Sequence, residues 1–201
     1  YDGKHLINYT KDFNLEDKVL TNLIIAYSAL WVGTKKNGIF KYTYKNGKFI
    51  KSTNYFSSDY IYSSAVKGGT LFFGTRGNGL INFKNKPERY TSTNGLINNL
   101  VYSILIDREN SIWVTTNKGI SKIISHKFKG YLNGEAVLSI CEYKGAIWVG
   151  TFENGLIKIE NEKTTACNQE NGLLRYKQIW ACLLYTSDAA DDMQCVDLGG
   201  R

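Results

Sequence analysis

The sequence predicts an all-β protein, a fragment of a β-propeller with about four complete four-stranded blades and a partial blade at each end. Three observations lead to this prediction: a motif that returns about every 40 residues, a hairpin pattern within each copy, and short alternating apolar runs with no helical periodicity. A left-handed solenoid or an open sandwich is the competing architecture, but sandwiches rarely keep so regular a repeat. The motif is anchored by aromatic residues 41, 41 and 35 positions apart, which are Trp31, Phe72, Trp113 and Trp148.

Each copy of the motif predicts a β-hairpin. An apolar run ends in Gly-Thr or, in the third copy, Thr-Thr; a short polar loop ends in glycine, and a second apolar run follows. Asn-Gly at 37–38, 78–79 and 154–155 favours a tight turn because both residues tolerate positive φ. The structural glycines of the repeat are Gly33, Gly74 and Gly150 before the loop and Gly38, Gly79, Gly119 and Gly155 after it.

Around the hairpin, each unit reads as four short strands. An apolar run with a small residue near its centre precedes the hairpin, and a polar turn with a weaker strand follows it. Those small residues fit an innermost strand, and the aromatic anchor of the second strand is expected to fill the space between blades. The predicted units are the end of a truncated blade at 1–22, blades at 23–60, 61–100, 101–135 and 136–175, and the start of a truncated blade at 176–181.

The last twenty residues do not follow this pattern. Residues 182–201 resemble the in-frame translation of a transposase-type sequencing adapter, and an acidic linker is the alternative. We expect this tail to be non-native, with no stable place in the fold and no partner in the last blade. Without it, the remaining 181 residues carry 24 basic and 14 acidic side chains, a net charge of +10 instead of the +7 of the whole chain.

Composition excludes several classes of protein. The chain has 201 residues, 43% of them apolar, and no run long enough to cross a bilayer or to act as a signal peptide. The cysteines form no disulfide framework or metal cluster; Cys141 reads as a small core residue and Cys167 as a free thiol. Because the basic residues are dispersed over all units, nucleic acid is not an expected partner.

No motif for catalysis, metal binding or a cofactor is present in the sequence. His5 and His126 stand alone in polar turns, and both are expected at the surface. Gly33 to Gly38 has the glycine spacing of a phosphate loop, but Ile39-Phe40 replaces its lysine and hydroxyl residue. Residues 107–110 lack the central glycine and distant glutamate of a calcium loop and read as a turn.

One segment carries a family resemblance. Residues 94–123, from Asn94-Gly-Leu through Ile112-Trp-Val-Thr-Thr to Gly119-Ile-Ser, resemble the two-component regulator propeller repeat. Residues 171–181 open a further copy. Departures are local, as Thr115 replaces the expected glycine and Phe72 the expected tryptophan.

The resemblance implies the extracytoplasmic, periplasmic sensor domain of an inner-membrane hybrid histidine kinase from a Bacteroidetes-like bacterium. The fragment itself would then be non-catalytic and would act in signal transduction by binding an extracellular glycan or other small ligand. Its partners would be the remaining propeller blades and the downstream signalling domains of the parent, and a homodimer stays open. A secreted propeller enzyme or lectin acting on polysaccharide, or a protein-docking propeller, is the alternative.

The candidate ligand-binding residues are those of the hairpin loops and of the segment leading into a first strand. Strands alternate in direction, so these two sets of connections are expected at one mouth, where amides, cations and an aromatic ring could bind a sugar. The alternative is that Asn-Gly simply makes the turn. The candidates are Lys36, Asn37, Arg76, Asn78, Asn98, Asn99, Lys118, Phe152 and Glu153.

The adapter prediction can be tested on source DNA. Amplification across the codons of Ala181 and Cys182 should give a different continuation, which we expect to encode another repeat. Recovery of the same codons for residues 182–201 from native DNA would contradict the prediction.

Overall fold

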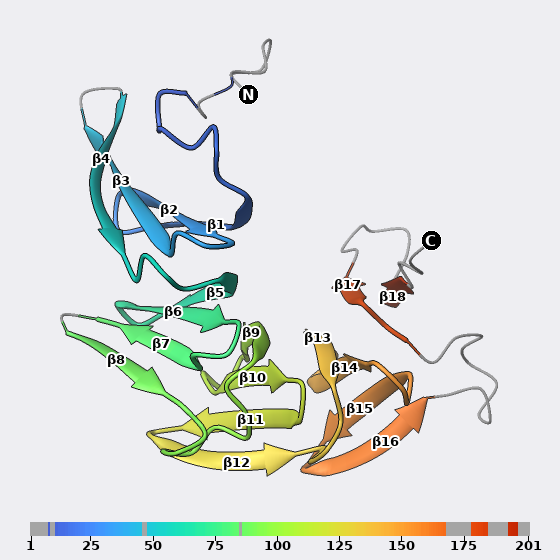
Figure 1. Cartoon of the computed structure of the whole chain (residues 1–201). Helices are drawn as coiled ribbons and strands as arrows, with labels where there is room; N and C mark the ends of the chain where they lie inside the picture. Colours follow the sequence, from blue (N-terminus) through green and yellow to red (C-terminus); the bar gives the residue numbers. More distant parts are fainter. Residues whose placement is uncertain are drawn as a thin grey trace. The chain divides into compact units, whose positions relative to one another are not determined.

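The computed structural model describes residues 8, 11–45, 48–84, 86–167, 178–184 and 193–196 of the chain (Figure 1). Contacts divide the chain into two compact units, Tyr1–Tyr62 and Ser63–Arg201. Every regular element among the described residues is a β-strand, which confirms the prediction of an all-β protein. Most of the repeat expected at 171–181 lies outside the described residues.

The strands form successive four-stranded antiparallel sheets in which sequence neighbours pair. The first sheet has the order β1-β2-β3-β4, and β1 begins three residues before the apolar run that starts at Leu23. Its strands are β1 (Leu20–Ala26), β2 (Ala29–Thr34), β3 (Ile39–Lys45) and β4 (Lys48–Tyr55).

Three further sheets repeat this order. The second contains β5 (Ile61–Lys67), β6 (Thr70–Thr75), β7 (Leu80–Phe83) and β8 (Pro87–Tyr90). The third contains β9 (Val101–Ile106), β10 (Ile112–Thr116), β11 (Gly119–Ile124) and β12 (Lys127–Tyr131). The fourth contains β13 (Val137–Tyr143), β14 (Ala146–Thr151), β15 (Leu156–Glu160) and β16 (Lys163–Cys167).

In the first unit, the segment before β1 covers one face of the sheet. Phe13 and Leu15 are buried against Val32, Phe40 and Tyr42. The Tyr42 hydroxyl donates a hydrogen bond of 2.7 Å to the Phe13 carbonyl, and the two rings stack with centroids 4.3 Å apart. Burial of this phenol raises its pKa from 10.0 to about 12, since the charged form would lose its hydration.

In the second unit, neighbouring sheets bury each other's faces. Phe72 of the second sheet packs with Ile112 and Val114 of the third, whereas Trp113, between those two residues in sequence, packs on Ile147 and other residues of the fourth. Alternate residues of β10 therefore point to opposite sheets, as a strand requires. The expectation that the aromatic anchor fills the space between blades is confirmed for Phe72 and Trp113.

The glycine before each hairpin loop is required by a close approach of the next first strand. A Cβ on Gly74 would lie 2.5 Å from Cγ1 of Val101, the fully buried first residue of β9. Gly33 faces Ile61 in the same way, and Gly150 faces Ile179. The third copy has Thr115 here, and its hydroxyl accepts a hydrogen bond of 3.0 Å from the Ser103 amide, so the substitution for glycine has a structural use.

The threonine that opens each hairpin loop clamps it. The Thr75 hydroxyl donates to the Gly79 carbonyl at 2.7 Å and accepts from the Asn78 amide at 3.0 Å. Thr34, Thr116 and Thr151 do the same in the other sheets, and all four side chains are fully buried. Gly79 has a φ of 76°, and a Cβ there would lie 2.1 Å from the Tyr90 carbonyl oxygen.

Part of the tail, residues 182–201, differs from what the sequence predicted. β17 (Ala181–Leu184) pairs antiparallel with β18 (Met193–Val196), and β17 contacts β13 and β14. The expectation that 182–201 has no partner is therefore wrong for these described residues, because β17 lies beside the first two strands of the last complete sheet. Its adapter origin stays a prediction.

The two cysteines agree with their predictions only in part. Cys141 is buried, as expected, but it is disulfide-bonded rather than a free core thiol. Its partner lies outside the residues whose side chains are described. Cys167 is free.

The threonine clamp gives a stability prediction. Thr151→Val keeps the shape of the side chain and removes both hydrogen bonds, so it should lower the free energy of unfolding by about 1–3 kcal/mol. Thr164→Val, on the exposed strand β16 of the same sheet, should change it by less than about 0.5 kcal/mol. Denaturant unfolding of the full chain measures both, and equal effects of the two variants would contradict the clamp.

The Tyr42 phenol predicts a loss of stability at high pH. The unfolded chain ionises this group near pH 10.0 and the folded chain near 12, so its contribution is complete below pH 10 and is lost as the pH rises towards 12. The wild-type chain should therefore lose stability over this interval relative to Tyr42→Phe. If the unfolding curves of the two proteins shifted in parallel between pH 10 and 12, the prediction would be wrong.

Candidate ligand-binding site

Two kinds of connection meet at one edge of each sheet. The hairpin loop joins the second and third strands, and an entry segment leads into the first strand of the same sheet or of the next one. The Gly79 amide donates to the Asn99 carbonyl at 2.9 Å, and the Phe152 amide donates to that of Ala136 at 2.9 Å. A hairpin loop and the adjoining entry segment together are called the mouth of that sheet.

The mouth of the first unit carries two predicted residues. Lys36 and Asn37 line a shallow pocket of about 260 Å³ together with Lys35, Val19 and Asp17. Both lysines are exposed, and the Lys35 ammonium lies 6.0 Å from the centre of the Tyr60 ring. The hydrogen bond from Lys18 holds the pKa of the Asp17 carboxyl below its usual range, so this pocket contains charges of both signs.

In the second unit, Arg76 and Asn78 lie on the hairpin loop of the second sheet, and both are exposed. Arg76 forms a β-bridge with Leu100, and the Gly77 amide donates to the Asn99 carbonyl at 3.1 Å. The loop is thus tied to its entry segment through the backbone.

Asn98 and Asn99 of this entry segment have structural roles. The Asn98 side-chain oxygen accepts from the Leu100 amide at 2.8 Å, and that of Asn99 accepts from the Ser92 amide at 2.7 Å. Both residues are half-buried. Their carbonyl ends are therefore engaged in shaping the segment, which leaves only their amide NH2 groups for a ligand.

The mouth of the third sheet contains Lys118, which is exposed. Its carbonyl accepts from the Gly134 amide at 3.0 Å. Beside it, the side-chain oxygen of Asn117 is buried and has no hydrogen-bond partner among the described residues. A buried acceptor of this kind is costly to leave unpaired, so a donor from a ligand or water would stabilise it.

Phe152 and Glu153 lie at the mouth of the fourth sheet. The Phe152 ring is 37% exposed and packs edge-on against Trp180, which is 45% exposed, with centroids 6.2 Å apart. The side-chain NH2 of Asn154 donates to the Glu135 carboxylate at 2.5 Å, and Glu153 is exposed. This mouth combines an aromatic pair with carboxylates and an amide.

Sequence reasoning missed Glu135 and Trp180 as members of these mouths. A signal for Trp180 was present, because an aromatic residue follows the buried first residue in Ile61-Tyr62, Val101-Tyr102 and Ile179-Trp180. No comparable signal marks Glu135, whose partner Asn154 lies nineteen positions away.

The chemistry of the mouths suits hydrogen bonding and stacking. The described mouth residues include no histidine; His126 is exposed, as expected, but it lies at the opposite ends of the strands. Among the described residues no group of three or more histidine, cysteine or acidic side chains could hold a metal ion. The candidate residues fall into separate groups around each sheet, and the structure brings Arg76 and Asn78 together with Asn98 and Asn99.

Comparisons with solved structures define the class. The extracellular domain of BT4673 from B. thetaiotaomicron, described as a hybrid two component system, is 23% identical with a TM-score of 0.68 over 88% of this chain and 27% of its own. That of BT3049 from the same organism is 21% identical with a TM-score of 0.66 over 82% and 24%. A catalytically inactive virginiamycin B lyase from Staphylococcus aureus is 17% identical, with a TM-score of 0.63 over 81% and 59%. The fold is that of a β-propeller.

Sequence comparisons identify the repeat. Residues 95–118 match the family described as two component regulator propeller. A curated relative, Histidine kinase P4 from Formosa agariphila, is 29% identical over 127 residues, which are 56% of this chain and 9% of the kinase. One segment of the chain therefore matches the two-component regulator propeller repeat, and the chain spans under a tenth of that relative. Within its described residues, no helix has the length and hydropathy to cross a membrane.

Proposed function

We propose that this chain is a ligand-sensing propeller from the extracytoplasmic, periplasmic part of a hybrid two-component signalling protein. The family match over residues 95–118 carries the proposal. The likeness to extracellular domains of hybrid two component systems and to a histidine kinase supports it. On this proposal the remaining blades and the downstream kinase domains are its partners, nucleic acid is not, and the chain itself performs no catalysis.

The proposed ligand is a glycan or another small extracellular molecule bound at the mouths. Exposed cations at Arg76 and Lys118 and the ring pair of Phe152 and Trp180 provide hydrogen bonding and stacking surface. These side chains stand on loops fixed by buried threonines, and loops held by a rigid scaffold are where binding residues concentrate.

An enzymatic function is the second candidate, because virginiamycin B lyase shares the fold. A lyase or glycosidase needs a general base or a pair of carboxylates converging on the substrate. The described mouths offer Glu135, already bonded to Asn154, and Glu153. Release of products from a polysaccharide by the purified full chain would favour this candidate over sensing; a docking role would give neither product nor binding.

Binding at the mouths can be tested with oligosaccharides. The full chain is screened against neutral and uronic-acid oligosaccharides on an array, and affinity for any that bind is measured by calorimetry. Arg76→Ala and Phe152→Ala should each weaken binding roughly tenfold, since each removes one charge-assisted or stacking contact. Thermal melting should stay unchanged because both side chains are exposed.

Arg108→Ala is the matched control. Arg108 is an exposed arginine at the opposite ends of the strands, near Glu142, and its removal should leave affinity unchanged. If Arg76→Ala and Phe152→Ala bound as tightly as this control, the mouths would not be the binding site.

A further inference from the structure

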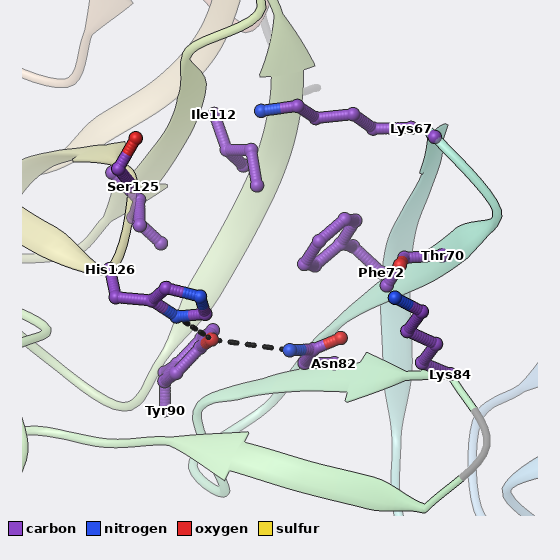
Figure 2. A pocket seen from close by; sticks show the side chains of 11 residues that line it. Lys67, Thr70, Phe72, Asn82, Lys84, Tyr90, Ile112, Ser125 and His126 are labelled. Carbon is purple, nitrogen blue, oxygen red and sulfur yellow. Dashed lines mark hydrogen bonds between the residues drawn. The ribbon is translucent and has the colours of Figure 1, made fainter.

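A second hollow lies away from the mouths, between the second and third sheets. It has a volume of about 270 Å³ and opens near the connections β5–β6, β7–β8 and β11–β12, at the ends of the strands opposite the hairpin loops (Figure 2). This hollow, called the basic groove, belongs entirely to the second unit.

The inner wall of the basic groove is apolar. Phe72 of β6 is 5% exposed, and Ile112 and Ile123 of the third sheet are 6% and 4% exposed. The Tyr90 ring, edge-on against Phe128, adds a second aromatic surface. Figure 2 shows Phe72 and Tyr90 around the same hollow, so a flat apolar body can contact both rings.

The rim of the basic groove is polar and positively charged. Lys67, Lys84 and His126 line it, and no carboxylate is among its lining residues. Lys67 donates a hydrogen bond to the Asn110 carbonyl, which neutralises none of its charge. Lys84 forms no hydrogen bond or ion pair with another described residue.

An amide and a phenol connect the two walls. Asn82 donates through its NH2 to the Tyr90 hydroxyl at 3.1 Å, and that hydroxyl lies 3.4 Å from Nδ1 of His126. The side-chain oxygen of Asn82 is buried and has no partner among the described residues. The groove therefore contains an unused acceptor beside unpaired positive charge.

The next pair of sheets has an equivalent groove with the opposite charge. Trp113 occupies the place of Phe72 and donates to the Asp107 carboxylate at 2.7 Å, and Asp107 stands where the second sheet has Lys67. Lys122, in place of Asn82, lies 4.8 Å from the Trp113 ring and 3.9 Å from Asp107. That groove is lined further by Glu109, Glu142, Glu160 and Glu162.

The two grooves together show which features packing requires and which features can vary between repeats. Packing requires an aromatic residue and branched side chains at the inner wall, and both grooves have them. The charge of the rim is not fixed by packing, because it reverses between the two grooves. In the groove between the third and fourth sheets, charged groups such as Lys122 and Asp107 pair with one another. In the basic groove, Lys84 and the Asn82 oxygen have no partner among the described residues.

We propose that the basic groove binds a small aromatic carboxylate that also carries a hydrogen-bond donor. The ring would lie against Phe72 and Tyr90, the carboxylate would pair with Lys84 and His126, and the donor would meet the Asn82 oxygen. Charge-assisted hydrogen bonds to a carboxylate and aromatic packing are the contacts that such residues form best. This site is separate from the mouths and does not depend on the sensing role proposed for them.

The test compares two compounds of the same shape. Binding of para-hydroxybenzoate and of its neutral amide, para-hydroxybenzamide, to the full chain is measured by ligand-observed nuclear magnetic resonance and calorimetry. The acid should bind at least roughly tenfold more tightly, since only it can pair with the cations. Binding of neither compound, or equal binding of both, would overturn the proposal.

Variants then locate the site. Lys84→Ala should weaken binding of the acid roughly tenfold, and Asn82→Asp, which places a carboxylate in the groove, should abolish it. Lys163→Ala, an exposed lysine of β16 outside the groove, should bind as the wild type does. Because Lys84 is exposed, its variant should keep the wild-type melting temperature, and unchanged affinity in it would place any binding elsewhere.

Discussion

Each sheet of this chain has apolar side chains on both faces, and only another layer can cover them. In the second unit this layer is the next sheet: Phe72 and Trp113 point forward, while residues such as Ile112 and Val114 point back. A single four-stranded sheet would leave one of these faces in water, so a repeat cannot be stable alone. In the first unit the segment around Phe13 performs this task for one face. The close approach of Gly74 to Val101 follows from the same packing.

Much of this arrangement could be predicted because the aromatic and apolar residues recur at regular intervals in the sequence. The spacing of Trp31, Phe72, Trp113 and Trp148 predicts the repeat, and the short continuous apolar runs around them predict strands that are buried on both faces. Partners in hydrogen bonds could not be predicted in the same way, since they depend on which segments meet in space. The threonine clamp could have been predicted, because threonine precedes every hairpin loop, but the Asn-Gly pair was taken as the determinant of the turn.

Other features depend on contacts that no local pattern records. The sequence predicted only a turn at Asp107, yet its carboxylate is buried and accepts hydrogen bonds from both the Ser111 amide and the Trp113 indole. The contact of β17 with β13 joins segments about forty residues apart in the chain. For the mouths, sequence located the loops correctly, but it could not tell that Asn98 and Asn99 hold backbone amides.

The clamp also has a consequence for how such a protein changes over generations. Because a buried hydroxyl and a glycine carbonyl close the loop, the side chains between them, such as Lys36, Arg76 or Phe152, carry little of the folding energy. Mutations there can be tried without loss of the scaffold, and duplication of one repeat supplies a new loop already folded. A lineage can therefore alter what one repeat recognises while its neighbours keep theirs, which makes the propeller an evolvable array of independent variable positions.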